Sequence, residues 1–221
     1  VGPLLLLLSL VLLLWPPSPL VQLVRRRRQQ SRQAGGGVRE RPWSSRRSIR
    51  TREPGGSDFG REIREIVLHS RGHIEPRSEA LLYAADRAHH VETKVRPALE
   101  AGKVVLTDRY LDSSVAYQGA GRILGATEVR DLSMWAIQGL LPALTVLLDL
   151  DAASAVARRA KTGDAPDRLE REKVEFFEAV RACYLELAAA EPDRFLFVDA
   201  RLSVDEIQAQ IRARVDELLG R

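Results

Sequence analysis

Cysteine, methionine and aromatic residues are scarce in this chain of 221 residues. Its single cysteine, Cys183, excludes an internal disulfide framework and a zinc centre built from several cysteines. With one methionine and five phenylalanines, the hydrophobic core has to be built from leucine, valine, isoleucine and alanine. Hydrophobic residues still make up 45% of the chain and charged residues 29%, which excludes wholesale disorder and favours one domain with an appendage.

Lysine is absent from the N-terminal part of the chain, and acidic residues nearly so. Residues 1–52 hold 11 arginines and a single acid, Glu40, which gives this segment a net charge of +10. Residues 53–221 hold 23 basic and 29 acidic residues, a net charge of −6. The overall net charge of +4 therefore combines a strongly basic segment with a mildly acidic body.

The first fifty residues lack the periodicity of amphipathic helices and strands. A leucine-rich run, an apolar run at 20–24 and the arginines Arg25–Arg28 follow one another, so residues 4–24 permit a membrane anchor, although three prolines disfavour it. Residues 29–50 favour a disordered basic linker over a lipid-binding arm. Aromatic residues do not alternate with its arginines as base stacking needs, so we expect no nucleic-acid partner.

Beyond residue 52, amphipathic helical patterns alternate with short apolar runs. The runs at 104–107, 144–150 and 195–198 are typical of buried strands. A capping box of Ser203 and Glu206 predicts the start of the last helix. This alternation predicts an α/β fold with a parallel sheet covered on both faces. The other helices are expected at Gly60–His69, Ser78–Ala101, Glu128–Leu140, Ala152–Ala160 and Arg171–Ala190.

Polar residues follow each predicted strand, and ligands of open parallel sheets bind at these carboxyl ends. Asp108 and Arg109 follow the first run, Asp149 and Asp151 the second, and Asp199 the third. An acid beside an arginine can position a magnesium ion and clamp a phosphate. A simple ion pair at the strand end is the alternative.

A basic loop joins two of the predicted helices around residues 163–166. Such a loop is typical of a lid that closes on phosphates, and equally of a solvated surface loop. Its basic residues are Arg158, Arg159, Lys161 and Arg168.

The histidines form no metal-binding pattern, and we expect them at the surface or at helix ends. They are His69, His73, His89 and His90. Cys183 lies within a helical pattern and is expected in the core.

Five ordered motifs resemble those of the bacterial thymidylate kinase family over residues 51–221. They are TREPGG at 51–56, LLYAADR at 81–87, DRYLDSSVAYQG at 108–119, PALTVLLD at 142–149, and DRLE at 167–170 with YLELA at 184–188. The resemblance implies a three-layer fold like that of P-loop nucleoside-monophosphate kinases. It also implies transfer of the γ-phosphoryl group of ATP to dTMP with Mg²⁺, in a cytoplasmic homodimer.

The resemblance assigns the nucleoside contacts. Tyr83 stacks on the thymine ring, and Arg87 hydrogen-bonds its carbonyl edge. Tyr117 lies against the deoxyribose and disfavours a 2′-hydroxyl, while Ser114 and Gln118 line the base pocket.

The resemblance also assigns the phosphate contacts. Arg109 holds the acceptor phosphate, and Asp108 acts near magnesium; with Arg168 they form the expected catalytic set. Three consecutive residues shape the acceptor side: Arg52, Glu53 and Pro54. A lid at about 157–170 closes on ATP with Arg158, Arg159, Lys161 and Arg168.

The loop G-x-x-x-x-G-K-[ST], with which this family cradles the ATP phosphates, occurs nowhere in the chain. Its lysine is expected roughly two dozen residues before the TREPGG motif, near Arg28. One hypothesis is that residues 1 to about 50 are an out-of-frame translation of that loop. The alternatives are a dTMP-binding pseudoenzyme and a fused or membrane-tethered kinase. In each case the central first strand of the sheet is expected to be missing, and residues 1–50 to be disordered or packed irregularly.

Overall fold

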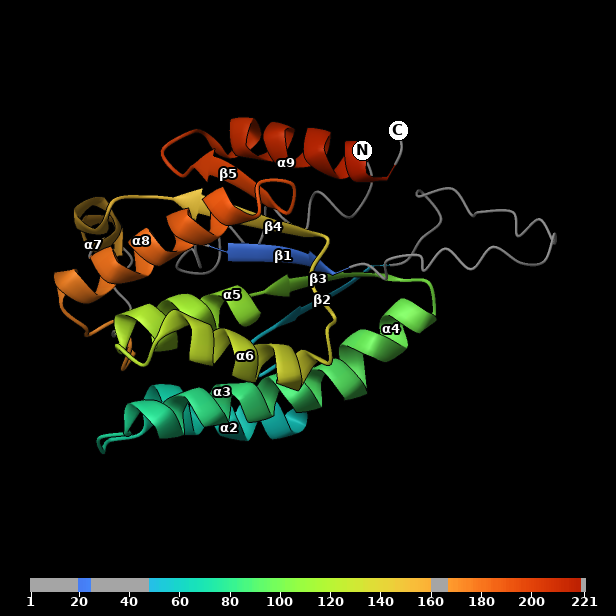
Figure 1. Ribbon diagram of the computed structural model, residues 1–221. Helices are drawn as coiled ribbons and strands as arrows, with labels where there is room; N and C mark the ends of the chain where they lie inside the picture. The colour runs from blue at the N-terminus through green and yellow to red at the C-terminus, as the bar shows by residue number, and fades with distance from the viewer. Residues whose placement is uncertain (1–19, 25–47, 160–166, 220–221) are drawn as a thin grey trace.

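The structure is a computed structural model that describes residues 20–24, 48–159 and 167–219. Its strands form one sheet in the order β2-β3-β1-β4-β5. In Figure 1 the sheet runs from β5 beside α9 to β2, with α2 and α3 beyond it. The strands are β1 (Leu20–Val24), β2 (Ser48–Arg52), β3 (Val104–Asp108), β4 (Leu144–Asp149) and β5 (Phe195–Asp199).

Helices follow the strands and confirm the α/β prediction. The described helices are α2 (Asp58–His69), α3 (Pro76–His90), α4 (Arg96–Glu100), α5 (Leu111–Ser114), α6 (Ala126–Ile137), α7 (Ala152–Arg159), α8 (Val174–Ala190) and α9 (Val204–Leu218), with wider π turns η2 (Val91–Val95) and η3 (Val115–Gly121). The capping box at the start of α9 is confirmed, because Ser203 and Glu206 cap each other's backbone amides. None of these helices is long and apolar enough to cross a membrane.

Side chains that alternate along β4 pack into two hydrophobic clusters. Val146 and Leu148 join the cluster that contains Ile207 and Ile211 of α9. Leu147 joins another cluster, formed largely by α2, η3 and α8. This alternation shows that the sheet is covered on both faces, which is the three-layer arrangement that the sequence predicted. Cys183 is buried in the second cluster, as predicted.

The middle of the sheet, which the sequence analysis left without a strand, is filled by β1. Val21 pairs with Asp108 on one side and with Val146 on the other, antiparallel in both cases. The pairs β2–β3 and β4–β5 are parallel, so the sheet is mixed rather than purely parallel. Without β1, the facing edges of β3 and β4 would both be unpaired. An apolar extended segment can satisfy such edges in either direction, which explains why an antiparallel strand fills the middle of the sheet.

The domain begins slightly before its predicted boundary. β2 starts at Ser48 and pairs with β3 along its whole length, so three of its residues belong to the segment 1–50. Apart from β1 and these three residues, the expectations for residues 1–50 lie outside the described residues. The same holds for most of the proposed membrane contact through residues 4–24.

Candidate active site

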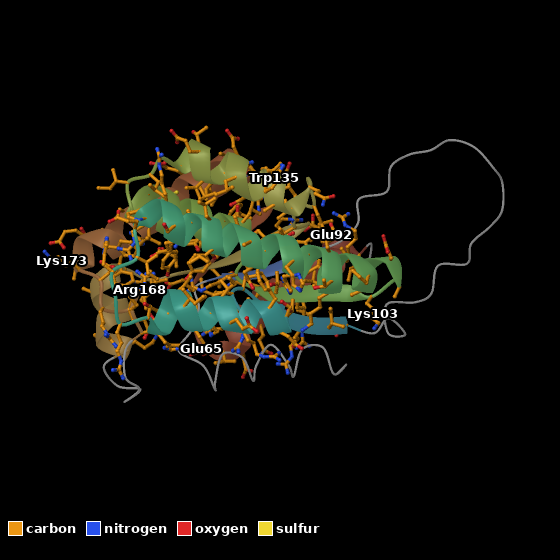
Figure 2. The ribbon with its side chains drawn as sticks, turned by 90° about the horizontal axis from the view of Figure 1, so that it is seen from below. Glu65, Glu92, Lys103, Trp135, Arg168 and Lys173 are labelled. Atoms are coloured by element: carbon orange, nitrogen blue, oxygen red, sulfur yellow. The ribbon has the colours of Figure 1, made fainter. Side chains whose placement is uncertain are left out.

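One face of α3 supplies most of the buried polar side chains of the site. Glu79, Tyr83, Arg87 and His90 lie three or four residues apart, which places them on one side of the helix. Each of them is no more than 7% exposed. α3 packs against both α2 and α6, and Figure 2 shows it crossing between these two helices. The site is therefore built inward from α3 towards the sheet.

Arg87 joins α3 to three other parts of the fold. Its Nε donates to Glu53 Oε2 at 2.8 Å, and its Nη1 donates to Ser133 Oγ at 3.2 Å. Its Nη2 donates to the Tyr110 carbonyl at 3.2 Å and to Ser114 Oγ at 3.0 Å. These bonds occupy four of the five guanidinium N–H groups, and the fifth, on Nη1, has no partner among residues 20–24, 48–159 and 167–219.

Glu53 and His90 form a second buried pair next to Arg87. His90 Nδ1 lies 2.9 Å from Glu53 Oε1, and its Nε2 lies 2.6 Å from Thr51 Oγ1. A carboxylate can only accept, so His90 donates from Nδ1. His90 ends α3, which agrees with the expected surface or helix-end position, but its side chain is fully buried. Its polar partners, 37 and 39 residues away in the chain, are what permits this burial.

The glycines after β2 allow the turn to lie directly against α3. The Gly55 amide donates to Asp86 Oδ1 at 3.3 Å. A Cβ on Gly56 would come within 2.5 Å of His90 Nε2, and one on Gly60 within 2.1 Å of Asp86 Oδ1. Larger residues at these positions would push the turn away from α3.

Asp86 is buried, and its Oδ2 has no hydrogen-bond partner in the described part of the chain. Burial, and next the nearby Glu53 carboxylate, raise the pKa of Asp86 to about 6. The carboxyl group therefore ionises less readily in the folded chain than in the unfolded one.

Replacing Asp86 with asparagine is expected to stabilise the protein in a pH-dependent way. Because the pKa rises from 3.8 to about 6 on folding, the stability of the wild type falls as the pH rises through this window. Asparagine keeps an acceptor for the Gly55 amide and does not ionise. Urea unfolding should show nearly equal stabilities at about pH 3, below the unfolded pKa, and a gain of up to about 3 kcal/mol for Asp86→Asn at about pH 8. If the free energies of unfolding of variant and wild type differed by the same amount at both pH values, the raised pKa of Asp86 would be contradicted.

Asp108 and Arg109 lie at the carboxyl end of β3. Arg109 has a left-handed backbone with φ of 64°, and its guanidinium carbon lies 4.7 Å from the centre of the Tyr117 ring. The Asp108 carbonyl accepts from the Glu53 amide at 2.9 Å, which joins the ends of β2 and β3. Within the described chain the two side chains form no ion pair with each other, and Asp108 Oδ1 has no hydrogen-bond partner there, so the alternative of a simple strand-end pair is not supported.

Asp108 also carries an oxygen that fits a metal ion. Its Oδ1 is buried and has no hydrogen-bond partner among the described residues. Magnesium binds through carboxylate oxygens and commonly uses only one or two of them together with phosphate oxygens. In the described residues no group of three His, Cys, Asp or Glu side chains forms a closed metal cage. The donor set thus fits an ion shared with a phosphate ligand.

Arg64 of α2 was missed by the sequence analysis. Its Nη1 donates to the Pro54 carbonyl at 3.1 Å. Burial lowers the pKa of Arg64, and the positive charges of Arg52 and, less strongly, Arg109 lower it further. The charges of Arg52 and Arg109 thus both act on Arg64, and a gathering of arginine charge favours the binding of an anion.

Aromatic rings form one side of the site. Tyr117 packs edge-on against Phe176 at 5.9 Å and Tyr184 at 6.5 Å between ring centres. The Tyr184 hydroxyl donates to Ser113 Oγ at 3.0 Å. Burial raises the pKa values of Tyr83 and Tyr184, so both phenols stay neutral at physiological pH.

Arg168 lies near the C-terminal end of the predicted lid segment and contacts α2 and α3. Its Nε donates to the Val67 carbonyl at 2.8 Å, and its Nη2 pairs with Glu79. Glu79 also accepts from Gln118 Nε2 at 2.8 Å and from Arg122 Nε at 3.4 Å. Figure 2 shows Arg168 beside α2. The residue thus contacts the α2–α3 side of the pocket in this structure.

The other lid residues lie elsewhere. Arg158, at the end of α7, donates from Nη1 to the Ala200 carbonyl beyond β5 at 3.2 Å. The side chain of Arg159 and the whole of Lys161 lie outside the described residues. The remaining predicted residues gather around the ends of β2 and β3: Arg52, Glu53, Pro54, Tyr83, Arg87, Asp108, Arg109, Ser114, Tyr117 and Gln118.

The chain is similar to known proteins over most of its length. A sequence profile of the family described as Thymidylate kinase matches residues 40–211. The thymidylate kinase of Clavibacter sepedonicus is 69% identical over 170 residues, which are 77% of this chain and 81% of that protein. The thymidylate kinase of Deinococcus radiodurans is 52% identical over 167 residues, which are 76% of this chain and 81% of that protein. This chain belongs to the thymidylate kinase family.

Proposed function

We propose that this chain binds dTMP between α3 and the ends of β2 and β3, and that it catalyses transfer of the γ-phosphoryl group of ATP to it. The observation that carries this proposal is the position of Arg109, which stacks on Tyr117 at the end of β3 and whose charge acts on Arg64. The relatives named thymidylate kinase support the choice of acceptor.

The described side chains fit the parts of dTMP. Tyr83 offers a neutral ring for the thymine to stack on, and the Arg87 Nη1–H that no described residue accepts can reach its carbonyl edge. Tyr117 lies where the deoxyribose would follow, and Ser114 and Gln118 line the remaining wall. Stacking gives affinity, whereas the few polar groups fix the orientation of the base.

Phosphoryl transfer depends on alignment and positive charge around the moving group rather than on covalent chemistry. Arg109 holds the acceptor phosphate, and the backbone turn of Arg52, Glu53 and Pro54 keeps it in place. The magnesium ion neutralises phosphate charge when bound, and Asp108 Oδ1 is the group that would hold it. Arg158, Arg159 and Lys161 are proposed for the ATP side, whereas Arg168 pairs with Glu79 beside the base pocket.

A transfer assay tests this proposal. ATP, Mg²⁺ and dTMP are incubated with the full chain, and dTDP is separated by chromatography. Formation of dTDP supports the kinase. Binding of dTMP without formation of dTDP would instead identify a nucleotide-binding protein. Resequencing the DNA that encodes residues 1–55 would show in the same experiment series whether a shifted frame restores the G-x-x-x-x-G-K-[ST] loop.

We also propose a cytoplasmic homodimer. Figure 2 is seen from the side of α2, α3 and α6, and these three helices carry four exposed large hydrophobic side chains: Phe59, Ile66, Leu81 and Trp135. Trp135 is the most exposed of the four, at 78%. A second copy packed on this layer would bury these side chains, and an apolar patch of this kind is typical of an interface.

Replacing Trp135 with glutamate is expected to convert the dimer into a monomer, because a charge would be buried at the centre of an apolar contact. Light scattering after size-exclusion chromatography gives the mass directly. Phe197→Glu, at an exposed position on β5, should leave the dimer intact. A monomeric wild type would contradict the proposed assembly.

A further inference from the structure

Glu79 is a buried carboxylate to which three side chains donate. It is 0% exposed, and Gln118 Nε2 lies 2.8 Å from its Oε1. Arg122 and Arg168 both form ion pairs with it. Two guanidinium groups thus compensate its charge, which a buried carboxylate requires.

This carboxylate decides which way the amide of Gln118 points. An ionised carboxylate has no proton to donate, so the Gln118 NH₂ group has to face Glu79. The opposite orientation would place two acceptor oxygens against each other at 2.8 Å. No donor in the described part of the chain reaches Gln118 Oε1. The amide therefore presents an acceptor on its other side.

The acceptor lies on the wall around Tyr83. Two cross-links join α3 to the segment that follows β3, namely Arg87 to Ser114 and Glu79 to Gln118. Tyr83 lies between them, four residues from each end, on the same face of α3. A base stacked on Tyr83 would therefore lie between the Arg87 and Gln118 side chains.

We propose that Glu79 is a positioning residue that makes the site selective for a pyrimidine with an N–H at N3, by holding Gln118 Oε1 towards the base as an acceptor. This inference rests on the proposed binding of dTMP. Thymine carries a proton at N3 and satisfies the acceptor. Cytosine presents a lone pair at N3, so two acceptors would face each other beside the Gln118 side chain, which is only 2% exposed. Buried mismatches of this kind are the basis of strong discrimination between ligands.

Glu79→Gln tests the inference, because a glutamine at 79 can donate as well as accept and thus permits Gln118 to turn over. Calorimetric titration of the full chain with dTMP and with dCMP gives both affinities. We expect the wild type to prefer dTMP by about 100-fold or more, and the variant to lose about tenfold or more of this preference. A variant that merely loosens the pocket would weaken both ligands equally and leave the ratio unchanged, which would overturn the inference.

Glu172→Gln is the matched control. Glu172 pairs with Arg122 at 2.6 Å in the same network but makes no contact with Gln118. Glu172→Gln should therefore keep the wild-type ratio of dTMP to dCMP affinity. A fall of this ratio as large as that in Glu79→Gln would overturn the specific role of Glu79.

Gln118→Leu covers the case in which Glu79→Gln does not fold. We expect it to lose the preference for dTMP, and adding Glu79→Gln to it should change the ratio no further. A wild-type ratio in Gln118→Leu would overturn the inference. If the wild type binds dTMP but the variants keep its ratio of dTMP to dCMP affinity, only the role of Glu79 is refuted. Absence of any dTMP binding by the wild type refutes the proposed function as well.

Discussion

Replacing Arg87 with methionine is expected to lower the free energy of unfolding by about 3–5 kcal/mol, since it removes one partner of a buried ion pair. Arg87 is 1% exposed, and its partner Glu53 is 3% exposed. Without the guanidinium, Glu53 keeps only His90 as a charged or polar side-chain partner among those described, and Ser133 and the Tyr110 carbonyl each lose a donor. Urea unfolding followed by circular dichroism measures the change.

An exposed arginine provides the comparison. Arg201 pairs with Asp199, but its side chain is 71% exposed. Arg201→Met should cost less than about 1 kcal/mol, because surface ion pairs contribute little. A loss of this small size for Arg87→Met would show that the buried network does not hold α3 to the sheet.

Replacing Arg109 with alanine is expected to weaken dTMP binding by about 10- to 150-fold. The substitution removes a charge-assisted hydrogen bond to the acceptor phosphate, typically worth about 1.5–3 kcal/mol. Thymidine lacks this phosphate, so its affinity should change much less than that of dTMP. Calorimetric titration with both ligands separates the loss of a phosphate contact from a general disturbance of the pocket.

Two outcomes would contradict this role of Arg109. An unchanged affinity for dTMP would show that another group holds the phosphate, and Arg64 would then be the first residue to replace. An equal loss for dTMP and thymidine would show that Arg109 acts through its contact with the Tyr117 ring, at 4.7 Å.

The strands that the sequence predicted are those whose signal is local. β3, β4 and β5 are continuous apolar runs, and their predicted bounds agree with the structure to within one residue at each end. β2 was missed because Ser48–Arg52 is mostly polar and only partly buried. The place of β1 was missed because strand pairing across more than 80 residues of chain leaves no local pattern.

The helical segment after β3 was also missed. Residues 115–121 contain two glycines, which lower helix propensity, yet they form the turn that carries Tyr117 and Gln118. Tertiary contacts with α8 and α6 stabilise this segment instead. Helix propensity therefore gave no signal for η3, because contacts with neighbouring helices stabilise this segment.

In the site, the motifs identified the residues but not the network that holds them. Asp86, Glu79 and His90 lie on the buried face of α3, and each acts on a partner more than 30 residues away. Such partners are invisible in a single sequence because nothing in the spacing links them. The acids on the buried face of α3, Glu79 and Asp86, were the available signal for such a network, since a charged residue is seldom buried without a partner.

Titration of the full chain with dTMP tests the central claim most directly. We expect binding of one dTMP per chain, a preference for dTMP over dCMP, and a large loss of affinity in Arg109→Ala. A wild-type chain that is folded by circular dichroism and yet binds no dTMP would contradict it.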